Sequence, residues 1–213
     1  MTVFSFERFC LTVSGMLRSV TSGEAGGAEL SGGDVEVSWA DREGRRCAAG
    51  LESVAGVAFE DALPVREFVS YRRQRHFPGL WWLAKTGRHV GYESWLERDH
   101  LMVLDSDCLV TGVSSQPFTL RWSEAGRTVA HTPDYFARMA DGSAVVVDVR
   151  PAARVRPRDR VKFEATAAAC ERLENWSFRL VHELDPVLAV NVRWLSGYRH
   201  PRYGDQSLGP LLR

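Results

Sequence analysis

The alternation of apolar and polar positions predicts regular secondary structure from residue 35 onward. Residues 35–39 alternate as a half-buried strand does, and turn residues follow at 41–44. Apolar residues at helical spacing predict a helix over 92–104, and good helix formers predict another over 158–173. The other expected elements are extended segments at 109–122 and 176–182, a hairpin at 128–150 and a short helix at 186–195.

The order of these elements predicts the fold class. From residue 92 it runs helix, three strands, helix, strand, helix. A tight hairpin forces an antiparallel pair of strands, whereas a helix between two strands permits a parallel pair. We therefore expect an α/β domain with a mixed sheet flanked by helices.

The domain organisation follows from length and from one composition shift. The chain has 213 residues, which suits one domain with an appendage. Residues 21–33 are rich in Gly, Ser and Ala and resemble a flexible linker. We expect a flexible segment at 1–33, an N-terminal extension with a strand and a turn at 34–67, and the main domain at 68–213.

Composition and charge exclude several classes of protein. Hydrophobic residues make up 45% and charged residues 25%, which excludes wholesale disorder and coiled coil. No apolar run of about 18 residues exists, so we expect no membrane span. Glu7 and Arg8 interrupt the apolar N-terminus, which makes it a poor secretory signal and predicts a cytoplasmic protein. The 27 basic residues balance the 27 acidic ones, so only local clusters of charge can indicate a nucleic-acid partner.

The hairpin at 128–150 carries a pair of aspartates whose relation depends on its turn. A two-residue loop at Asp141-Gly142 would place Asp134 opposite Val149. A three-residue loop with Gly142 in the left-handed conformation would place Asp134 opposite Asp148, with Cβ atoms about 4.5–5.5 Å apart. Two carboxylates that close repel each other unless a cation lies between them. Such oxygen-rich sites suit Mg²⁺ or Mn²⁺.

Two further residues complete a possible hydrolytic site. Arg150 lies two positions after Asp148 and projects from the same face of the strand. Glu97 adds a third carboxylate from the preceding helix. Carboxylates that hold metal ions, beside a cation that neutralises phosphorane charge, suit phosphodiester hydrolysis. Each residue also has a structural alternative: Asp134 as a turn residue, Asp148 and Arg150 in a salt bridge, and Ser94-x-x-Glu97 as a helix capping box.

Basic residues cluster on both sides of this constellation in the sequence. A local patch of this kind can bind DNA in a chain of zero net charge, with strong salt sensitivity. The alternative is a solvated surface with ion pairs. His131, close to Asp134, suits either a supporting hydrogen bond at a metal site or a purely structural one. The candidate DNA-binding residues are Arg72, Arg73, Arg75, Arg154, Arg156 and Lys162.

Several motifs in order resemble the PD-(D/E)xK nuclease superfamily, and more closely the TnsA-type endonuclease subunit of heteromeric transposases. The resemblance covers about residues 68–198, through SYRRQRHFPG, TGRHVGYESWLE, SSQPFTL, HTPDYF and VVVDVRPA. It implies a restriction-endonuclease-like core. It assigns catalytic roles to Glu97, Asp134, Asp148 and Arg150, with Glu93 as a stand-in for Glu97. It assigns metal binding, of Mg²⁺ or Mn²⁺, to Glu97, Asp134, Asp148 and the carbonyl of Val149.

The resemblance also implies partners. A protein of this family cuts one strand of double-stranded DNA at the 5′ ends of a mobile element. A TnsB-like transposase cuts the other strand, and a TnsC-like ATPase regulates both. The family has lysine where this chain has Arg150, and arginine stays protonated and cannot act as a base. Lys162 is a reserve cation. Two other function classes stay open: a stand-alone nuclease in defence or plasmid maintenance, and an inactive DNA-binding assembly subunit.

Overall fold

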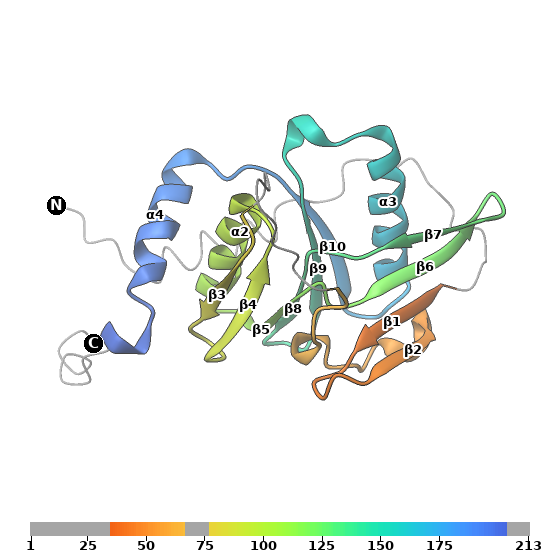
Figure 1. Ribbon diagram of the computed structural model, residues 1–213, viewed down its shortest axis with the longest axis horizontal. Helices are drawn as coiled ribbons and strands as arrows, with labels where there is room; N and C mark the ends of the chain where they lie inside the picture. Colours follow the sequence, from red (N-terminus) through yellow and green to blue (C-terminus); the bar gives the residue numbers. More distant parts are fainter. Residues whose placement is uncertain (1–34, 67–76, 204–213) are drawn as a thin grey trace.

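The computed structural model describes residues 35–66 and 77–203, which form three sheets and three α-helices (Figure 1). The helices are α2 (Trp95–Ser106), α3 (Pro157–Glu171) and α4 (Pro186–Gly197). The strands are β1 (Glu36–Ala40), β2 (Arg46–Gly50), β3 (Gly79–Leu83), β4 (Arg88–Tyr92), β5 (Val110–Ser115), β6 (Thr119–Glu124), β7 (Arg127–His131), β8 (Tyr135–Met139), β9 (Ala144–Val149) and β10 (Trp176–Val181). Short 3₁₀ helices are η1 (Leu51–Val54), η2 (Phe59–Asp61), η3 (Ala152–Arg154) and η4 (Pro201–Tyr203).

The central sheet has the strand order β10-β9-β8-β5. β9 runs antiparallel to β8, and β8 runs antiparallel to β5, whereas β10 is parallel to β9 across the crossover helix α3. The expected mixed α/β architecture is therefore confirmed. In Figure 1, α2 and α3 lie on opposite sides of this sheet.

The buried strand β9 explains why the sheet has helices on both faces. Ala144 and Val146 belong to the hydrophobic cluster that contains Ala165 and Ala169 of α3. Their neighbours in the strand belong to the second cluster, which contains Leu101 and Leu104 of α2. An almost continuous apolar run is typical of a strand that is buried on both faces. Asp148 shares the side of β9 that carries Ala144 and Val146, so it lies toward α3.

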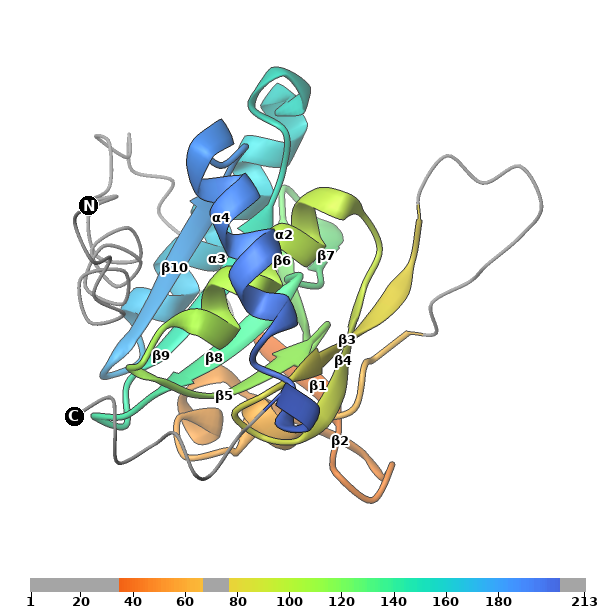
Figure 2. The same ribbon diagram turned by 90° about the vertical axis from the view of Figure 1, so that its left-hand side faces the viewer.

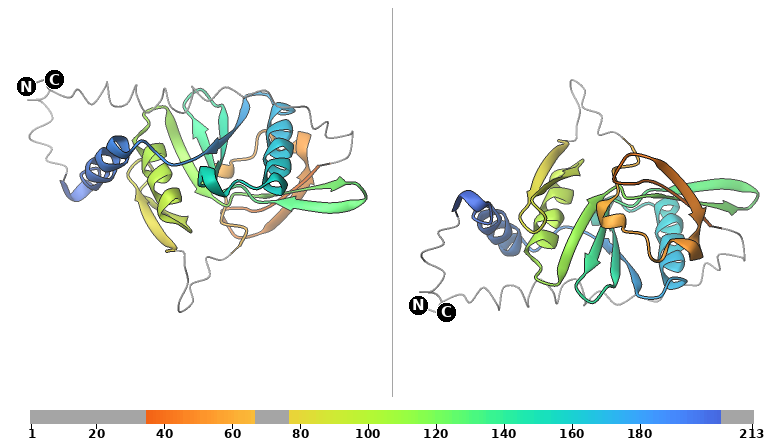
Figure 3. Two further views of the ribbon diagram at one scale, coloured as in Figure 1. Left: turned by 90° about the horizontal axis from the view of Figure 1, so that it is seen from above. Right: turned by 90° about the horizontal axis from the view of Figure 1, so that it is seen from below.

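The sheet β2-β1-β6-β7 covers the outside of the first cluster. β1 pairs with β6, with Val37 opposite Leu120, and both side chains are buried in that cluster. The strand and turn expected at 35–44 are present. Residues 35–62 thus share a hydrophobic core with the central sheet and α3. Figure 3 shows the β6–β7 hairpin, in light green, extending outward on the α3 side.

The expected hairpin at 128–150 needs one correction. Residues 128–139 do not form one arm, because β7 pairs with β6 while β8 pairs with β9 and β5. Pro133 has no N–H to donate, and the chain changes sheets at residues 132–134. The β8–β9 hairpin itself is confirmed: Tyr135 lies opposite Val147, and Gly142 has φ 86°. This is the three-residue loop, in which left-handed Gly142 closes the turn.

Helix α4 lies alongside α2 and is held there by ion pairs (Figure 2). Arg193 of α4 pairs with the buried Asp99, and Arg199 pairs with the buried Asp105. The opposite face of α4 exposes Val187, Val190 and Trp194. Within the described residues, no helix is both long enough and apolar enough to cross a membrane.

Candidate active site

Asp134 and Asp148 lie side by side at one end of the β8–β9 hairpin. The register that pairs Tyr135 with Val147 places Asp134, one residue before β8, opposite Asp148 of β9. Asp148 is 1% exposed and Asp134 is half-buried. The backbone N–H of Val149 donates to Oδ2 of Asp134 over 2.7 Å, which fixes that carboxylate against the end of β9. The structure therefore brings together the two aspartates that the sequence selects.

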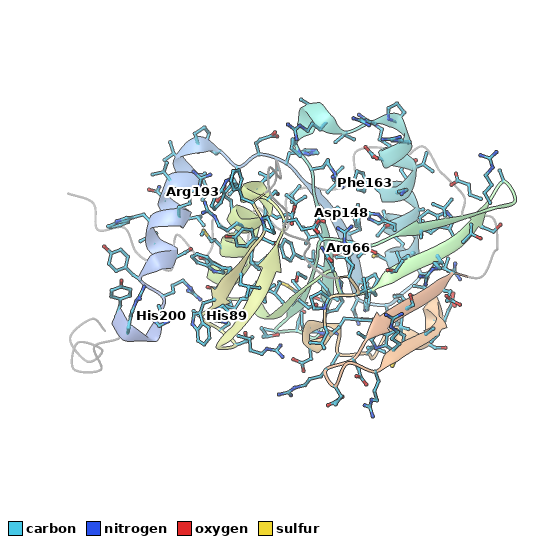
Figure 4. All side chains as sticks on the ribbon, viewed as in Figure 1. Arg66, His89, Asp148, Phe163, Arg193 and His200 are labelled. Atoms are coloured by element: carbon cyan, nitrogen blue, oxygen red, sulfur yellow. The ribbon has the colours of Figure 1, made fainter. Side chains whose placement is uncertain are left out.

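The two oxygens of Asp148 have different surroundings. Oδ2 lies 2.7 Å from Nε2 of His131, whose ring packs edge-on against Phe163 of α3. Figure 4 labels Asp148 and Phe163, between β9 and α3. Oδ1 is buried and has no hydrogen-bond partner within the described part of the chain. An orphaned buried carboxylate oxygen is costly, and a cation or a proton would satisfy it.

The environment of Asp134 favours its protonated form. Burial raises the pKa of Asp134 well above its ordinary value, and the neighbouring charges of Asp148 and Glu97 raise it further. The Val149 N–H and the Arg150 guanidinium act in the opposite direction. A cation beside a buried carboxyl group favours its ionised form. The surroundings of Asp134 would therefore be compensated by a bound cation.

Glu97 is engaged as a helix cap. Ser94 is the N-cap of α2, and its hydroxyl accepts the Glu97 N–H over 3.2 Å. The Glu97 carboxylate in turn accepts the Ser94 hydroxyl at 2.8 Å and the Glu93 N–H at 2.7 Å. Burial raises the pKa of Glu97, and the charge of Glu93 adds to this. The capping alternative is thus realised, although Glu97 still faces the same cavity as Arg150.

This cavity, called here the active-site hollow, has a volume of about 510 Å³ and lies at the end of β9. Its lining includes Glu93, Glu97, Val149, Arg150, Arg154, Arg156, Arg158 and Asp159. All four arginines are exposed, and none forms an ion pair within the described residues. Four guanidinium groups against three carboxylates make the rim suited to an anionic ligand.

The candidate DNA-binding residues differ in their position relative to the active-site hollow. Arg154 and Arg156 line the active-site hollow, as does Arg158, which the sequence reasoning did not select. Arg158 follows Arg154 and Arg156 at the same two-residue spacing, and this pattern could have indicated it. Lys162 is half-buried on α3 and does not line the hollow. Arg72, Arg73 and Arg75 lie outside the described residues.

Gln116, which belongs to the SSQPFTL segment of the motif resemblance, contacts the backbone of Asp134. Its N–H donates to the carbonyl of Asp134 over 2.9 Å, and its own carbonyl accepts the N–H of Val65. Gln116 has φ 47° and is 2% exposed. Left-handed backbone is uncommon for residues other than glycine, and such strain clusters at functional sites. Gln116 thus connects the backbone at 65 to that of Asp134.

The donor set fits an oxygen-preferring divalent cation in its chemistry and only in part in its arrangement. Asp134 and Asp148 form a pair with one orphaned oxygen, which suits Mg²⁺ or Mn²⁺. Across residues 35–66 and 77–203, however, no three His, Cys, Asp or Glu side chains are grouped so that they could hold a metal ion. Glu97 stays in its helix cap rather than joining the pair.

Neither a family model nor a curated protein matches the sequence.

Proposed function

We propose that the chain is a metal-dependent DNA endonuclease of the TnsA type. The observation that carries this proposal is the opposed pair Asp134 and Asp148, with an orphaned buried oxygen, beside an arginine-lined hollow. The order α2, β5, β8, β9, α3, β10 and the mixed central sheet support the restriction-endonuclease-like core that the motifs imply. Paired carboxylates next to a fixed cation are the groups that phosphodiester hydrolysis needs.

The proposed roles follow from position. Asp134, Asp148 and the carbonyl of Val149 would hold Mg²⁺ or Mn²⁺. A bound divalent cation supplies a nucleophilic hydroxide at neutral pH and neutralises phosphate charge. Arg150 donates its guanidinium N–H groups to the scissile phosphate and, because it stays protonated, does not act as a base.

The remaining arginines of the hollow bind the phosphates next to the scissile one. Arg154, Arg156 and Arg158 are exposed at its rim. Phosphate contacts of this kind position a duplex without reading its sequence. Glu97 would join the metal only by giving up the hydrogen bonds from Ser94 and Glu93. Among the proposed metal ligands, Glu97 is therefore the one whose carboxylate would have to break existing hydrogen bonds in order to bind the metal.

The partners belong to the same proposal. The motif resemblance favours a chain that cuts one strand at the 5′ ends of a mobile element. A TnsB-like transposase would cut the other strand, under control of a TnsC-like ATPase. A stand-alone nuclease would use the same site without these partners, so dependence of cleavage on a transposase distinguishes the two.

A second candidate function is a DNA-binding assembly subunit that does not cut. Two observations favour it: the Glu97 carboxylate is committed to capping α2, and the described residues contain no three-ligand cluster. Arg150 in place of the family's lysine agrees with a lost activity. Such a subunit would bind DNA through the arginines of the hollow whether or not Asp134 is present.

Nicking of supercoiled plasmid tests the proposal. Wild type and Asp134→Ala are each incubated with Mg²⁺, Mn²⁺ or EDTA, with and without a TnsB-like transposase. Nicking that requires both the metal and Asp134 supports the nuclease, and a requirement for the transposase supports the TnsA-type role. DNA binding by both proteins without nicking under any condition contradicts the nuclease and supports the assembly subunit.

A further inference from the structure

A second cavity, called here the trough, lies on the outer face of the β2-β1-β6 sheet and has a volume of about 610 Å³. Its floor consists of small side chains, Ser38 and Ala40 of β1 and Ala48 of β2. The segment 63–66 forms one wall. The opposite face of the same strands is buried in the core, so the sheet holds this floor rigidly.

The trough carries a positive excess. Arg46, Arg66 and Arg121 line it, with Glu36 as the single carboxylate of the lining. Glu36 pairs with Arg121, and Glu93 of the active-site hollow pairs with Arg66, so the excess among the described residues is one positive charge, that of Arg46. Arg46 is exposed and has no ion pair among the described residues. Arg121 is oriented along the floor, donating to the Ser38 hydroxyl over 2.6 Å. In a chain of zero net charge, such an excess on one rigid concave face suits a polyanion.

Two connections run from the trough toward the candidate active site, one to the active-site hollow and one to Asp134. Arg66 of the trough pairs with Glu93 of the hollow, Nη2 to Oε2, at 2.8 Å. Val65, also in the trough wall, donates its N–H to Gln116, whose own N–H donates to the carbonyl of Asp134. Figure 4 labels Arg66, at one end of the first connection, and Asp148, which lies opposite Asp134 in the hairpin. An ion pair therefore links the lining of the trough to that of the hollow.

We propose that the trough is a second binding site for the backbone of duplex DNA, which holds the segment that flanks the bond cut beside Asp134. This inference rests on the proposed function. A duplex carries about one negative charge per 1.7 Å of its axis, so a segment that spans both cavities presents phosphates to both sets of arginines. The small floor residues allow close approach of the backbone, and Arg46 and Arg121 receive the phosphates. These contacts fix the register of the duplex and do not read its sequence.

DNA binding by the inactive full-length variant Asp134→Asn tests the inference. Its affinity for a long duplex of about 30 base pairs is measured over a range of salt concentrations. The trough variant adds Arg46→Ala and Arg121→Ala. The control adds Arg127→Ala and Arg202→Ala, which remove the same charge from exposed positions outside both cavities. Thermal melting shows whether each variant is folded.

On the long duplex we expect the trough variant to bind about tenfold more weakly than the control, with a salt slope lower by about two. Equal binding of both variants to the long duplex would overturn the inference while leaving the proposed nuclease intact. Absence of DNA binding by Asp134→Asn itself would overturn the proposed function and the inference together. Binding of polyglutamate that depends on Arg46 and Arg121, with DNA binding unchanged, would instead assign the trough to an acidic protein partner.

Discussion

Nε2 of His131 lies 2.7 Å from one oxygen of Asp148, and the other oxygen of that carboxylate is buried without a partner in the described part of the chain. His131 stands in β7 and Asp148 in β9, so the contact joins the outer sheet to the central one. The histidine fixes the rotation of the carboxylate and leaves Oδ1 as the oxygen that can bind a cation. Loss of a group that orients a metal ligand in this way typically lowers metal affinity about 10- to 100-fold.

We predict that His131→Ala weakens metal-dependent nicking by raising the Mg²⁺ concentration needed for half-maximal rate about 10- to 100-fold. His131→Gln keeps a side-chain N–H donor and should recover most of this loss. The measurement is the nicking rate as a function of Mg²⁺ for the three proteins. A His131→Ala protein that melts at a lower temperature but keeps the wild-type Mg²⁺ dependence would show that the contact is only structural.

Asp134→Asn should stabilise the metal-free protein at neutral pH. Burial and the charges of Asp148 and Glu97 raise the pKa of Asp134, so the native state binds its proton more tightly than the unfolded chain. Between the ordinary and the raised pKa the native state holds more protons, and the free energy of unfolding falls as pH rises. Asparagine is neutral at every pH and can still accept the Val149 N–H.

The check is thermal melting in EDTA from pH 4 to 8. The melting temperature of wild type should fall across this range more steeply than that of Asp134→Asn, and the variant should melt higher at pH 8. Asp159→Asn, which changes a carboxylate at the rim of the hollow, serves as the control. A lower melting temperature for Asp134→Asn at pH 8 would contradict the prediction.

Replacement of Arg150 and of Lys162 shows which of these two side chains supplies the positive charge at the proposed active site. Arg150→Ala should lower the nicking rate about 10²- to 10³-fold, as loss of one charge-stabilising donor does in other enzymes. Arg150→Lys, which introduces the lysine of the nuclease family that the motifs resemble, should retain at least about a tenth of the wild-type rate. Lys162→Ala should be near wild type because Lys162 does not line the hollow. Loss of nicking in Lys162→Ala with full activity in Arg150→Ala would assign the cation to Lys162.

The ion pair between Asp99 and Arg193 should stabilise the packing of α4 on α2. Asp99 is 4% exposed and accepts two hydrogen bonds from the guanidinium, at 2.9 and 2.5 Å. Arg193→Ala should lower the free energy of unfolding by about 1–3 kcal/mol because it leaves a buried carboxylate with fewer donors. Urea unfolding measures this, with Arg202→Ala as a surface control. A change below about 0.5 kcal/mol would show that the pair between Asp99 and Arg193 contributes little to holding α4 on α2.

Helix propensity and alternating apolar positions were sufficient to predict individual helices and strands. The helix formers at 158–173 correspond to α3, and the extended pattern at 176–182 corresponds to β10. The hairpin turn left two registers open, because a glycine in the left-handed conformation fits either loop. A shift of one residue moves every side chain to the other face, so only the observed pairing of Tyr135 with Val147 placed Asp134 beside Asp148.

The sequence pattern did not show which distant segments pair as strands. Residues 128–131 have a strand pattern, but nothing local says that they pair with β6 rather than continue into β8. The contact of His131 with Asp148 depends on the pairing of β7 with β6. From the sequence, His131 suited either a supporting hydrogen bond at a metal site or a purely structural one. The trough could not be foreseen either, because it forms only when β1 pairs with β6.

Glu97 shows a different limit. Ser94-x-x-Glu97 satisfies both a capping box and the first carboxylate of a nuclease, and the residue types cannot distinguish them. The structure has the cap formed, with Glu97 still at the edge of the active-site hollow. One residue can thus satisfy two patterns, and its contacts decide which of them is realised in a given state.

Calorimetric titration of Mn²⁺ into the purified protein tests the central claim, that Asp134 and Asp148 form a divalent-cation site, without relying on cleavage. The matched set is wild type, Asp148→Asn and Asp159→Asn, since Asp159 is a carboxylate that lines the hollow and does not belong to the pair. We predict one Mn²⁺ bound per chain in wild type and Asp159→Asn, and none in Asp148→Asn. Absence of binding in wild type, or equal binding in all three proteins, would contradict the claim.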